Sequence, residues 1–185
     1  MYPFFRLGWQ LWRHRDDPPL GLLDTHESRH VCWPWDLDVW RELNNGRTLT
    51  LYDLGRLPMS ARMGITPILR RNHWGMVMAG ASVRWRRRVQ GFERLTMRSR
   101  GVGWDARFIY SEQSLWKSDG DCASHILLRA AVTGRDGIIP PARVIEAMGR
   151  DPAPPPLPRW VKDWIEADAE RPWPPMGDRA ETTLA

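Results

Sequence analysis

Two sets of residues alternate along DTHESRHVCW, residues 24–33, and this period of two predicts a β-strand. One face of the strand would carry His26, Ser28, His30 and Cys32, and the other would carry Glu27, Arg29, Val31 and Trp33. Pro34 ends the strand, and residues 35–43 read as a loop. The predicted strand is therefore followed by a loop that contains two closely spaced aspartates.

The strongest helical pattern covers residues 46–63, where leucines recur at helical spacings. Asn44 or Asn45 is the expected N-cap, because an asparagine side-chain oxygen can accept the free N–H groups of a first helical turn. Four leucines predict burial on several sides of this helix: Leu49, Leu51, Leu54 and Leu57. Pro58 lies inside the span and predicts a kink or a break there.

From residue 74 to residue 133 the pattern changes to a period of two, which predicts four further strands. In the first of them, residues 75–89, one face would carry Val77, Ala79, Ala81, Val83 and Trp85. Gly91 and Gly120 fall in the intervening turns, where a permissive backbone is needed. Consecutive strands joined by short turns predict an antiparallel meander.

The N-terminal residues 3–13 place aromatic and aliphatic side chains near one side of a helix and cationic residues beside them. The apolar side would carry Phe4, Phe5, Gly8, Trp9, Leu11 and Trp12. Two interpretations are open: the helix docks on the domain, or it makes peripheral contact with a membrane interface, which favours aromatic and cationic residues together. The sequence DDPP, residues 16–19, ends this element.

The chain of 185 residues divides into three parts on composition. Residues 1–19 form the amphipathic N-terminal segment, and residues 20–150 form the main domain, which ends with a short helix over 140–148. Half of the 16 prolines lie in residues 151–185, which predicts a proline-rich tail containing one short helix.

The formal net charge is +5, and among 27 Lys and Arg residues only Lys117 and Lys162 are lysine. A mildly basic surface fits a nucleic acid, an anionic membrane or a phosphate-bearing substrate. Cys32 and Cys122 show no disulfide or zinc-knuckle spacing, so we expect a reducing, cytoplasmic compartment. The five histidines form no metal-binding pattern, and we expect neither a metal nor a cofactor.

A strand, a carboxylate-bearing loop, one long buried helix and a run of antiparallel strands together resemble the hotdog fold, an α+β arrangement in which a sheet wraps a central helix. Within that fold the chain resembles 4-hydroxybenzoyl-CoA thioesterases and plant acyl-carrier-protein thioesterases. The resemblance is carried by Asp36, Leu37, Asp38, Val39, Asn44, Asn45, Gly46, Leu49 and Asp53. It covers about twenty residues closely and the element order over residues 24–135.

The resemblance implies hydrolysis of an acyl thioester with Asp38 as the catalytic carboxylate. Glu42 stands where the plant enzymes have a histidine, and it is a candidate substitute base. Asp36 is expected mainly to form hydrogen bonds within the loop. The start of the helix offers free N–H groups, and those of Gly46 or Arg47 would hold the oxyanion. Asn44 and Asn45 complete the expected substrate-binding set.

Three arginines, Arg84, Arg86 and Arg88, would lie on one face of a strand. They fit the phosphates of coenzyme A, since guanidinium groups bind phosphate in a forked geometry. A solvated strand face is the plainer interpretation. Nucleic-acid binding is disfavoured, because Trp85 would point away from the arginines and could not stack beside them.

Two functional hypotheses follow from the sequence. In the first, the chain is an enzyme acting on acyl-CoA or an acyl-carrier-protein substrate in a homodimer or a pair of dimers, with an apolar acyl tunnel. Candidate walls of that tunnel are Trp35, Trp40, Met76 and Met78. In the second, the chain is a non-catalytic member of the fold that binds an acyl chain or a partner protein, and Trp40 fills the substrate entrance.

Overall fold

The computed structural model describes residues 2–175. The chain divides into two compact units, and the boundary in the sequence falls between Pro155 and Pro156. The first unit contains the helices α1 (Phe4–Arg13), α2 (Asn45–Met63), α3 (Ile65–Arg71) and α4 (Pro141–Ala147), and the short 3₁₀ helix η1 (Pro34–Asp36). Its strands are β1 (Thr25–Val31), β2 (Gly75–Trp85), β3 (Arg94–Trp104), β4 (Ile109–Lys117), β5 (Cys122–Gly134) and β6 (Gly137–Ile139). The second unit contains α5 (Arg159–Ala169), the helix expected in the tail, and the tail beyond residue 175 lies outside the described residues.

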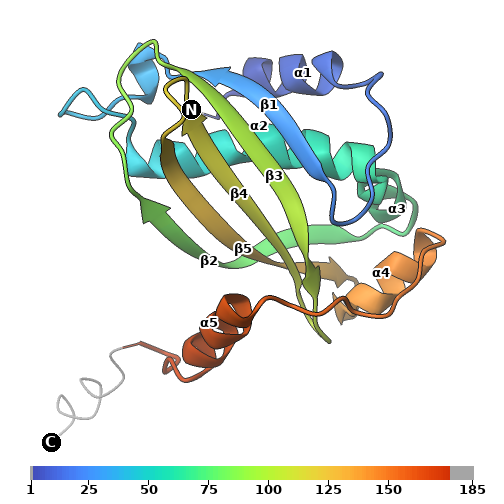
Figure 1. The fold of residues 1–185 in the computed structure, drawn as a ribbon. Helices are drawn as coiled ribbons and strands as arrows, with labels where there is room; N and C mark the ends of the chain where they lie inside the picture. Colours follow the sequence, from blue (N-terminus) through green and yellow to red (C-terminus); the bar gives the residue numbers. More distant parts are fainter. Residues whose placement is uncertain (1, 176–185) are drawn as a thin grey trace, which may run out of the picture. The chain divides into compact units, whose positions relative to one another are not determined.

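A curved antiparallel sheet wraps around α2, as Figure 1 shows, and this confirms the expected arrangement. The strand order is β1-β3-β4-β5-β2, and the short β6 pairs with β5. The alternation predicted for the first strand is present, because His26, Ser28, His30 and Cys32 are all buried. The strand therefore turns this polar face toward the interior.

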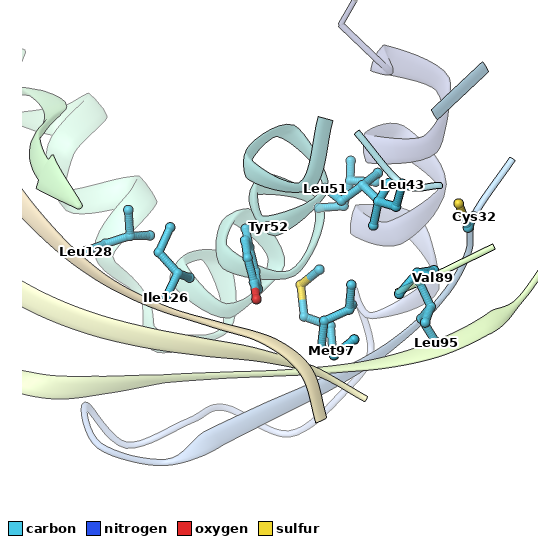
Figure 2. Close-up of a cluster of buried hydrophobic side chains, with 12 residues drawn as sticks. Cys32, Leu43, Leu51, Tyr52, Val89, Leu95, Met97, Ile126 and Leu128 are labelled. Carbon is cyan, nitrogen blue, oxygen red and sulfur yellow. The ribbon is translucent and has the colours of Figure 1, made fainter. Parts of the chain in front are cut away.

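The main core lies between α2 and the concave face of the sheet. Tyr52 of α2 points toward the sheet near Met97 of β3 and Ile126 of β5, and Leu51 lies beside Leu43, as Figure 2 shows. Burial of each such side chain stabilises the fold by about 1.5–3 kcal/mol, and these contributions are the main stabilisation of the sheet against the helix. Gly55 lets the sheet come close, since a Cβ atom there would lie 2.5 Å from the sulfur of Met97.

The predicted meander is wrong for one strand. β3, β4 and β5 do pair in order, but β2 pairs with β5 at the far edge instead of with β3. Residues 86–93 therefore form a crossing connection, not a hairpin turn. This connection is held by backbone hydrogen bonds to the residues before α2, among them Leu43 N–H to the Val89 carbonyl at 2.8 Å.

The predicted faces of β2 are also corrected. A β-bulge lies between Met78 and Gly80, and it shifts the register against β5. Met76 and Val83 both pack on buried clusters although they are an odd number of residues apart. A strict period of two would place Met76 and Val83 on opposite faces, whereas the extra residue of the bulge lets both face the interior.

Helix α2 differs from its prediction in two respects. It runs through Pro58 to Met63 without a break, and Pro58 is buried. Leu51 and Leu54 are buried as expected, whereas Leu49 and Leu57 are exposed. The sheet therefore covers one side of the helix, and leucines on another side are exposed. The prediction that all four leucines are buried is wrong.

Candidate active site

The first turn of α2 presents free backbone donors. Asn44 is the N-cap, one of the two predicted candidates, and its side-chain oxygen accepts the N–H of Arg47 at 3.0 Å. The Thr48 N–H binds the Asn44 carbonyl. Among the described residues, the N–H groups of Asn45 and Gly46 have no acceptor, as helix geometry requires of a first turn. Of the two expected oxyanion donors, Gly46 and Arg47, the N–H of Arg47 is therefore already bound by the side chain of the cap.

A cavity of about 250 Å³ lies beside this first turn, between α2, the end of β2 and the start of β5. We call it the helix-start cavity. Asn45 and Thr48 of α2 line it, and so does the carboxylate-bearing Glu42. Three consecutive arginines, Arg86–Arg88, also line it. The cavity brings together a carboxylate, a helix N-terminus and a cluster of cations.

Glu42 is held at the edge of the helix-start cavity by its backbone. Its N–H donates to the Asp38 carboxylate at 3.3 Å, and its carbonyl accepts the N–H of Asp38 at 2.8 Å. An isolated β-bridge joins it to Gln90 of the crossing connection. Its side chain is half-buried and lies 3.1 Å from the guanidinium of Arg88. Loop and connection together therefore fix Glu42 next to the cations.

Asp38 is occupied within the loop. Its Oδ1 accepts the N–H of Trp40 at 2.8 Å as well as that of Glu42. Its carbonyl accepts the N–H of Arg41, which has a positive φ of 61°. Asp38 does not line the helix-start cavity. The structure therefore shows Asp38 closing a tight turn that presents Glu42.

Asp36 is fully buried, and it makes more interactions than Asp38. Its carboxylate accepts from Arg6 at 2.7 Å, from Arg47 at 2.7 Å and from the Trp33 N–H at 3.0 Å. Its carbonyl accepts the Asn44 N–H at 3.0 Å. Asp36 is thus a hydrogen-bonding residue, as expected, but its partners tie α1 and α2 together. Arg47 directs its side chain to Asp36, away from the expected substrate role.

The arginines expected on one strand face are arranged differently. β2 ends at Trp85, and the N–H groups of Arg86 and Arg87 both donate to the Ala123 carbonyl. Arg84 stands opposite His125 of β5 and is absent from the lining of the helix-start cavity. Arg86 and Arg88 do line the cavity, and so does Arg87, which the alternation of the strand would have placed on its other face. The end of the strand, not its face, gathers the cations.

Two hydroxyl-bearing residues of the cavity were not foreseen. Ser124 lies on β5, and its hydroxyl is 2.8 Å from that of Tyr52 on α2. Burial raises the pKa of Tyr52, so the phenol stays protonated. Thr48, the other, bonds its hydroxyl to the Asn44 carbonyl at 3.1 Å. A strand serine distant in sequence carries no local signal that would reveal it.

The cysteines and the metal-ligating residues offer no second centre. Burial raises the pKa of Cys32 to about 11 and also raises that of Cys122, so both thiols stay protonated at neutral pH. Within residues 2–175, no three side chains of the His, Cys, Asp and Glu types gather closely enough to hold a metal ion.

The expected walls of an acyl tunnel do not meet in one place. Met76 and Met78 line an apolar cavity of about 40 Å³ beneath the second half of α2, which is too small for an acyl chain. Trp35 lines a separate groove beside α1. Trp40 is 79% exposed and does not line the helix-start cavity, so it does not plug the entrance there.

Comparisons with known proteins agree with this architecture. The model of a family described as the thioesterase-like superfamily matches residues 32–165. The Protein THEM6 from Xenopus laevis is 31% identical over 147 residues, which cover 78% of this chain and 69% of that protein.

Among solved structures, a putative oleoyl thioesterase from Lactobacillus plantarum superposes with a TM-score of 0.61 at 17% identity, covering 74% of this chain and 55% of that one. A hypothetical thioesterase from Streptococcus pneumoniae, solved with coenzyme A, gives 0.52 at 13% identity, covering 64% of this chain and 84% of that one. The predicted hotdog fold is confirmed, and the chain belongs to the thioesterase-like superfamily.

Proposed function

We propose that this protein hydrolyses an acyl thioester, acyl-CoA, in the helix-start cavity. One observation carries the proposal: Glu42, Asn45 of the first turn of α2 and Arg86–Arg88 all line the same 250 Å³ cavity, whereas Gly46 does not line it. A thioesterase needs a carboxylate or other base, an oxyanion site and a binding site for the carrier. The cavity supplies a residue set for each of these three requirements.

Glu42 is the residue we assign as general base. Its carboxylate takes a proton from a water molecule, and the water oxygen bonds to the thioester carbonyl carbon. The carbonyl oxygen gains the negative charge, which the N–H group of Asn45 at the start of α2 stabilises by about 3–4 kcal/mol. The C–S bond then breaks, and Glu42 returns the proton to the departing thiolate. The products are a carboxylic acid and a free thiol.

The family resemblance favours Asp38 as the catalytic carboxylate, but the position of Asp38 supports a positioning role. Its Oδ1 accepts two loop N–H groups, including that of Glu42. A carboxylate so engaged orients the loop that carries the base. We therefore propose Asp38 as a positioning residue, and the experiment below separates this role from direct attack on the carbonyl.

The arginines support coenzyme A as the carrier. Arg86, Arg87 and Arg88 are exposed and line the cavity together with residues from the start of α2. Coenzyme A carries a diphosphate and a 3′-phosphate, and guanidinium groups bind such groups through paired N–H donors. The Streptococcus pneumoniae structure holds coenzyme A, which supports the same choice for this chain.

A homodimer joined through β2 is part of the proposal. β2 is an edge strand of the sheet, and 11 residues of its backbone lie along that edge. Val77 and Met78 are exposed there, and Trp85 lies half-exposed at the end that borders the helix-start cavity. An apolar edge strand of this length favours pairing with a second chain. Light scattering should give twice the chain mass, and Val77→Lys should yield monomers.

The test is release of free thiol from a panel of acyl-CoA substrates of different chain lengths. We expect turnover by the wild-type chain and a loss of at least about a hundredfold in kcat for Glu42→Gln, the scale of a general base. Asp38→Asn should retain more activity than Glu42→Gln. The reverse order would assign catalysis to Asp38, and full activity in both variants would refute the carboxylate mechanism.

The alternative of a non-catalytic binding protein is favoured by one observation, the use of the Asp38 carboxylate inside its own loop. The panel of acyl-CoA substrates also tests this alternative. Saturable binding of acyl-CoA without thiol release would support the binding protein and refute the enzyme.

A further inference from the structure

Helix α1 lies on the domain with its polar residues inward. Gln10 is buried, and its amide donates to the Arg29 carbonyl at 3.0 Å. Arg6 reaches inward to Asp36 and also donates to the Val31 carbonyl at 2.9 Å. Leu7 packs at the margin of the core. The contacts that hold α1 are thus mainly polar.

The aromatic residues of α1 face outward. The exposed fractions are 71% for Phe4, 97% for Phe5, 53% for Trp9 and 54% for Trp12. Trp9 and Trp12 stack with their ring centroids 5.0 Å apart. An amphipathic helix normally buries its apolar side, because exposed aromatic area costs about 25 cal/mol per Å². This orientation indicates that an apolar medium or partner covers α1 from outside.

The exposed aromatic surface continues beyond α1 onto Trp35 and Phe92, which are both exposed and are joined by the half-buried Trp33. Trp33 stacks on Trp35 at 5.4 Å and meets Phe92 edge-on at 6.0 Å. Phe5 borders two grooves of about 660 and 670 Å³, one of which also contains Trp33 and the other Trp35. We call this surface the aromatic face, and its members are Phe4, Phe5, Trp9, Trp12, Trp33, Trp35 and Phe92.

Cations surround the aromatic face. Arg29 and Arg94 line the first groove beside Trp9, and both are exposed. Arg13 is exposed at the end of α1, and Arg15 lies over the ring of Trp12 at 4.5 Å. Acidic groups on this side are paired with cations: Asp36 with Arg6 and Arg47, and Asp16 with Arg15. The surface therefore combines exposed aromatic rings with net positive charge.

We propose that the aromatic face binds the surface of an anionic phospholipid bilayer. Tryptophan and phenylalanine rings enter the boundary between headgroups and acyl chains, while arginines contact lipid phosphates. The charge favours lipid over a second copy of the chain, because two copies would bring Arg29 and Arg94 against their own equivalents. None of the helices in residues 2–175 is long and apolar enough to cross a membrane.

In this orientation the second groove opens toward the bilayer. Besides Phe4, Phe5 and Trp35, it is lined by Leu37 and by Asn44, the N-cap of α2. The groove therefore connects the aromatic face with the start of α2. Binding to lipid does not depend on the proposed hydrolysis, and either can fail without the other.

The test is co-sedimentation of the full chain with vesicles of phosphatidylcholine alone, or of phosphatidylcholine and phosphatidylglycerol in equal parts. Phe5→Gln and Trp9→Gln each remove one aromatic ring from an exposed helical position. The matched control is Trp173→Gln, since Trp173 is 88% exposed and lies in the second unit. Circular dichroism and urea unfolding should show all three variants folded like the wild type.

We expect binding to the anionic vesicles, weakened about tenfold or more by Phe5→Gln or Trp9→Gln and unchanged in Trp173→Gln. Added salt should weaken it further, because screening shortens the reach of the arginines. Absence of binding, equal binding by Phe5→Gln and the wild type, or equal binding to neutral vesicles would overturn the proposal. Sedimentation equilibrium tests a second copy of the chain as the occupant. If Phe5→Gln and Trp9→Gln abolish self-association and the wild type does not bind lipid, the proposal is also overturned.

Discussion

The buried carboxylate of Asp36 offers the sharpest test of how the first unit is held together. Asp36→Asn keeps the size of the side chain and removes its charge. The carboxylate accepts from Arg6 and Arg47 at 2.7 Å each and from the Trp33 N–H at 3.0 Å. Two of these three bonds carry charge on both partners, and such bonds contribute about 1.5–3 kcal/mol each.

Loss of the Asp36 charge also leaves two guanidinium groups facing a neutral amide. Breaking a buried ion pair typically costs about 3–5 kcal/mol, and we expect Asp36→Asn to fall in this range. Domains of this size have about 5–15 kcal/mol of stability, so the variant should unfold at a much lower urea concentration. Tryptophan fluorescence follows the transition, and hydrogen exchange in α1 should accelerate because Arg6 loses its anchor.

The matched control is Glu27→Gln on β1. Glu27 pairs with Arg98 across two strands at 3.3 Å, and both side chains are half-exposed. Exposed pairs of this kind contribute about 0.2–1 kcal/mol, so the control should change the unfolding midpoint little. If Asp36→Asn cost no more than Glu27→Gln, the assignment of Asp36 as the link between α1 and α2 would be wrong.

Two further predictions concern the packing and the pH dependence of the fold. Gly55→Ala should destabilise the fold by about 1–3 kcal/mol, because its Cβ would meet Met97 and Ser99. Gly8→Ala has open space around its Cβ and should stabilise the fold by about 0.5–1 kcal/mol. Urea unfolding compares the two variants, and a change of the same sign in both would contradict the packing. Burial lowers the pKa of His26 to about 4 and that of His30 to about 3 from an ordinary 6.5. Between pH 6.5 and these values the unfolded chain binds protons that the folded chain does not, so stability is complete above pH 6.5 and falls as the pH drops. The loss at pH 5 should be about 2 kcal/mol for each histidine, measured by urea unfolding at several pH values, and constant stability from pH 7 to pH 5 would refute it.

Elements with local signals could be predicted from the sequence. The start of α2 follows from the asparagine cap, and β1 follows from alternation, since both depend on neighbouring residues. The place of β2 next to β5 could not be predicted, because it is decided by pairing between strands some fifty residues apart and by a bulge at Ala79. Pro58 was expected to break α2, yet packing against the sheet keeps the helix continuous.

The candidate site was located better than its residues were assigned. The loop and the helix start are where the spacing of Asp36, Asp38 and Asn44 indicated. The sequence could not show that Asp36 would be buried, because its partner Arg6 is 30 residues away. It also could not show that Arg86–Arg88 would turn away from β2 and line a cavity with Glu42, which depends on the crossing connection.

The central claim is that Glu42 and the start of α2 form a hydrolytic centre, and the most direct measurement is the kcat for release of coenzyme A from acyl-CoA. Glu93→Gln is a suitable control, since Glu93 is also partly buried and paired, with Lys117, but does not line the helix-start cavity. We predict that Glu42→Gln loses at least about a hundredfold in kcat while Glu93→Gln retains wild-type turnover. Equal turnover by Glu42→Gln and the wild type would contradict the claim.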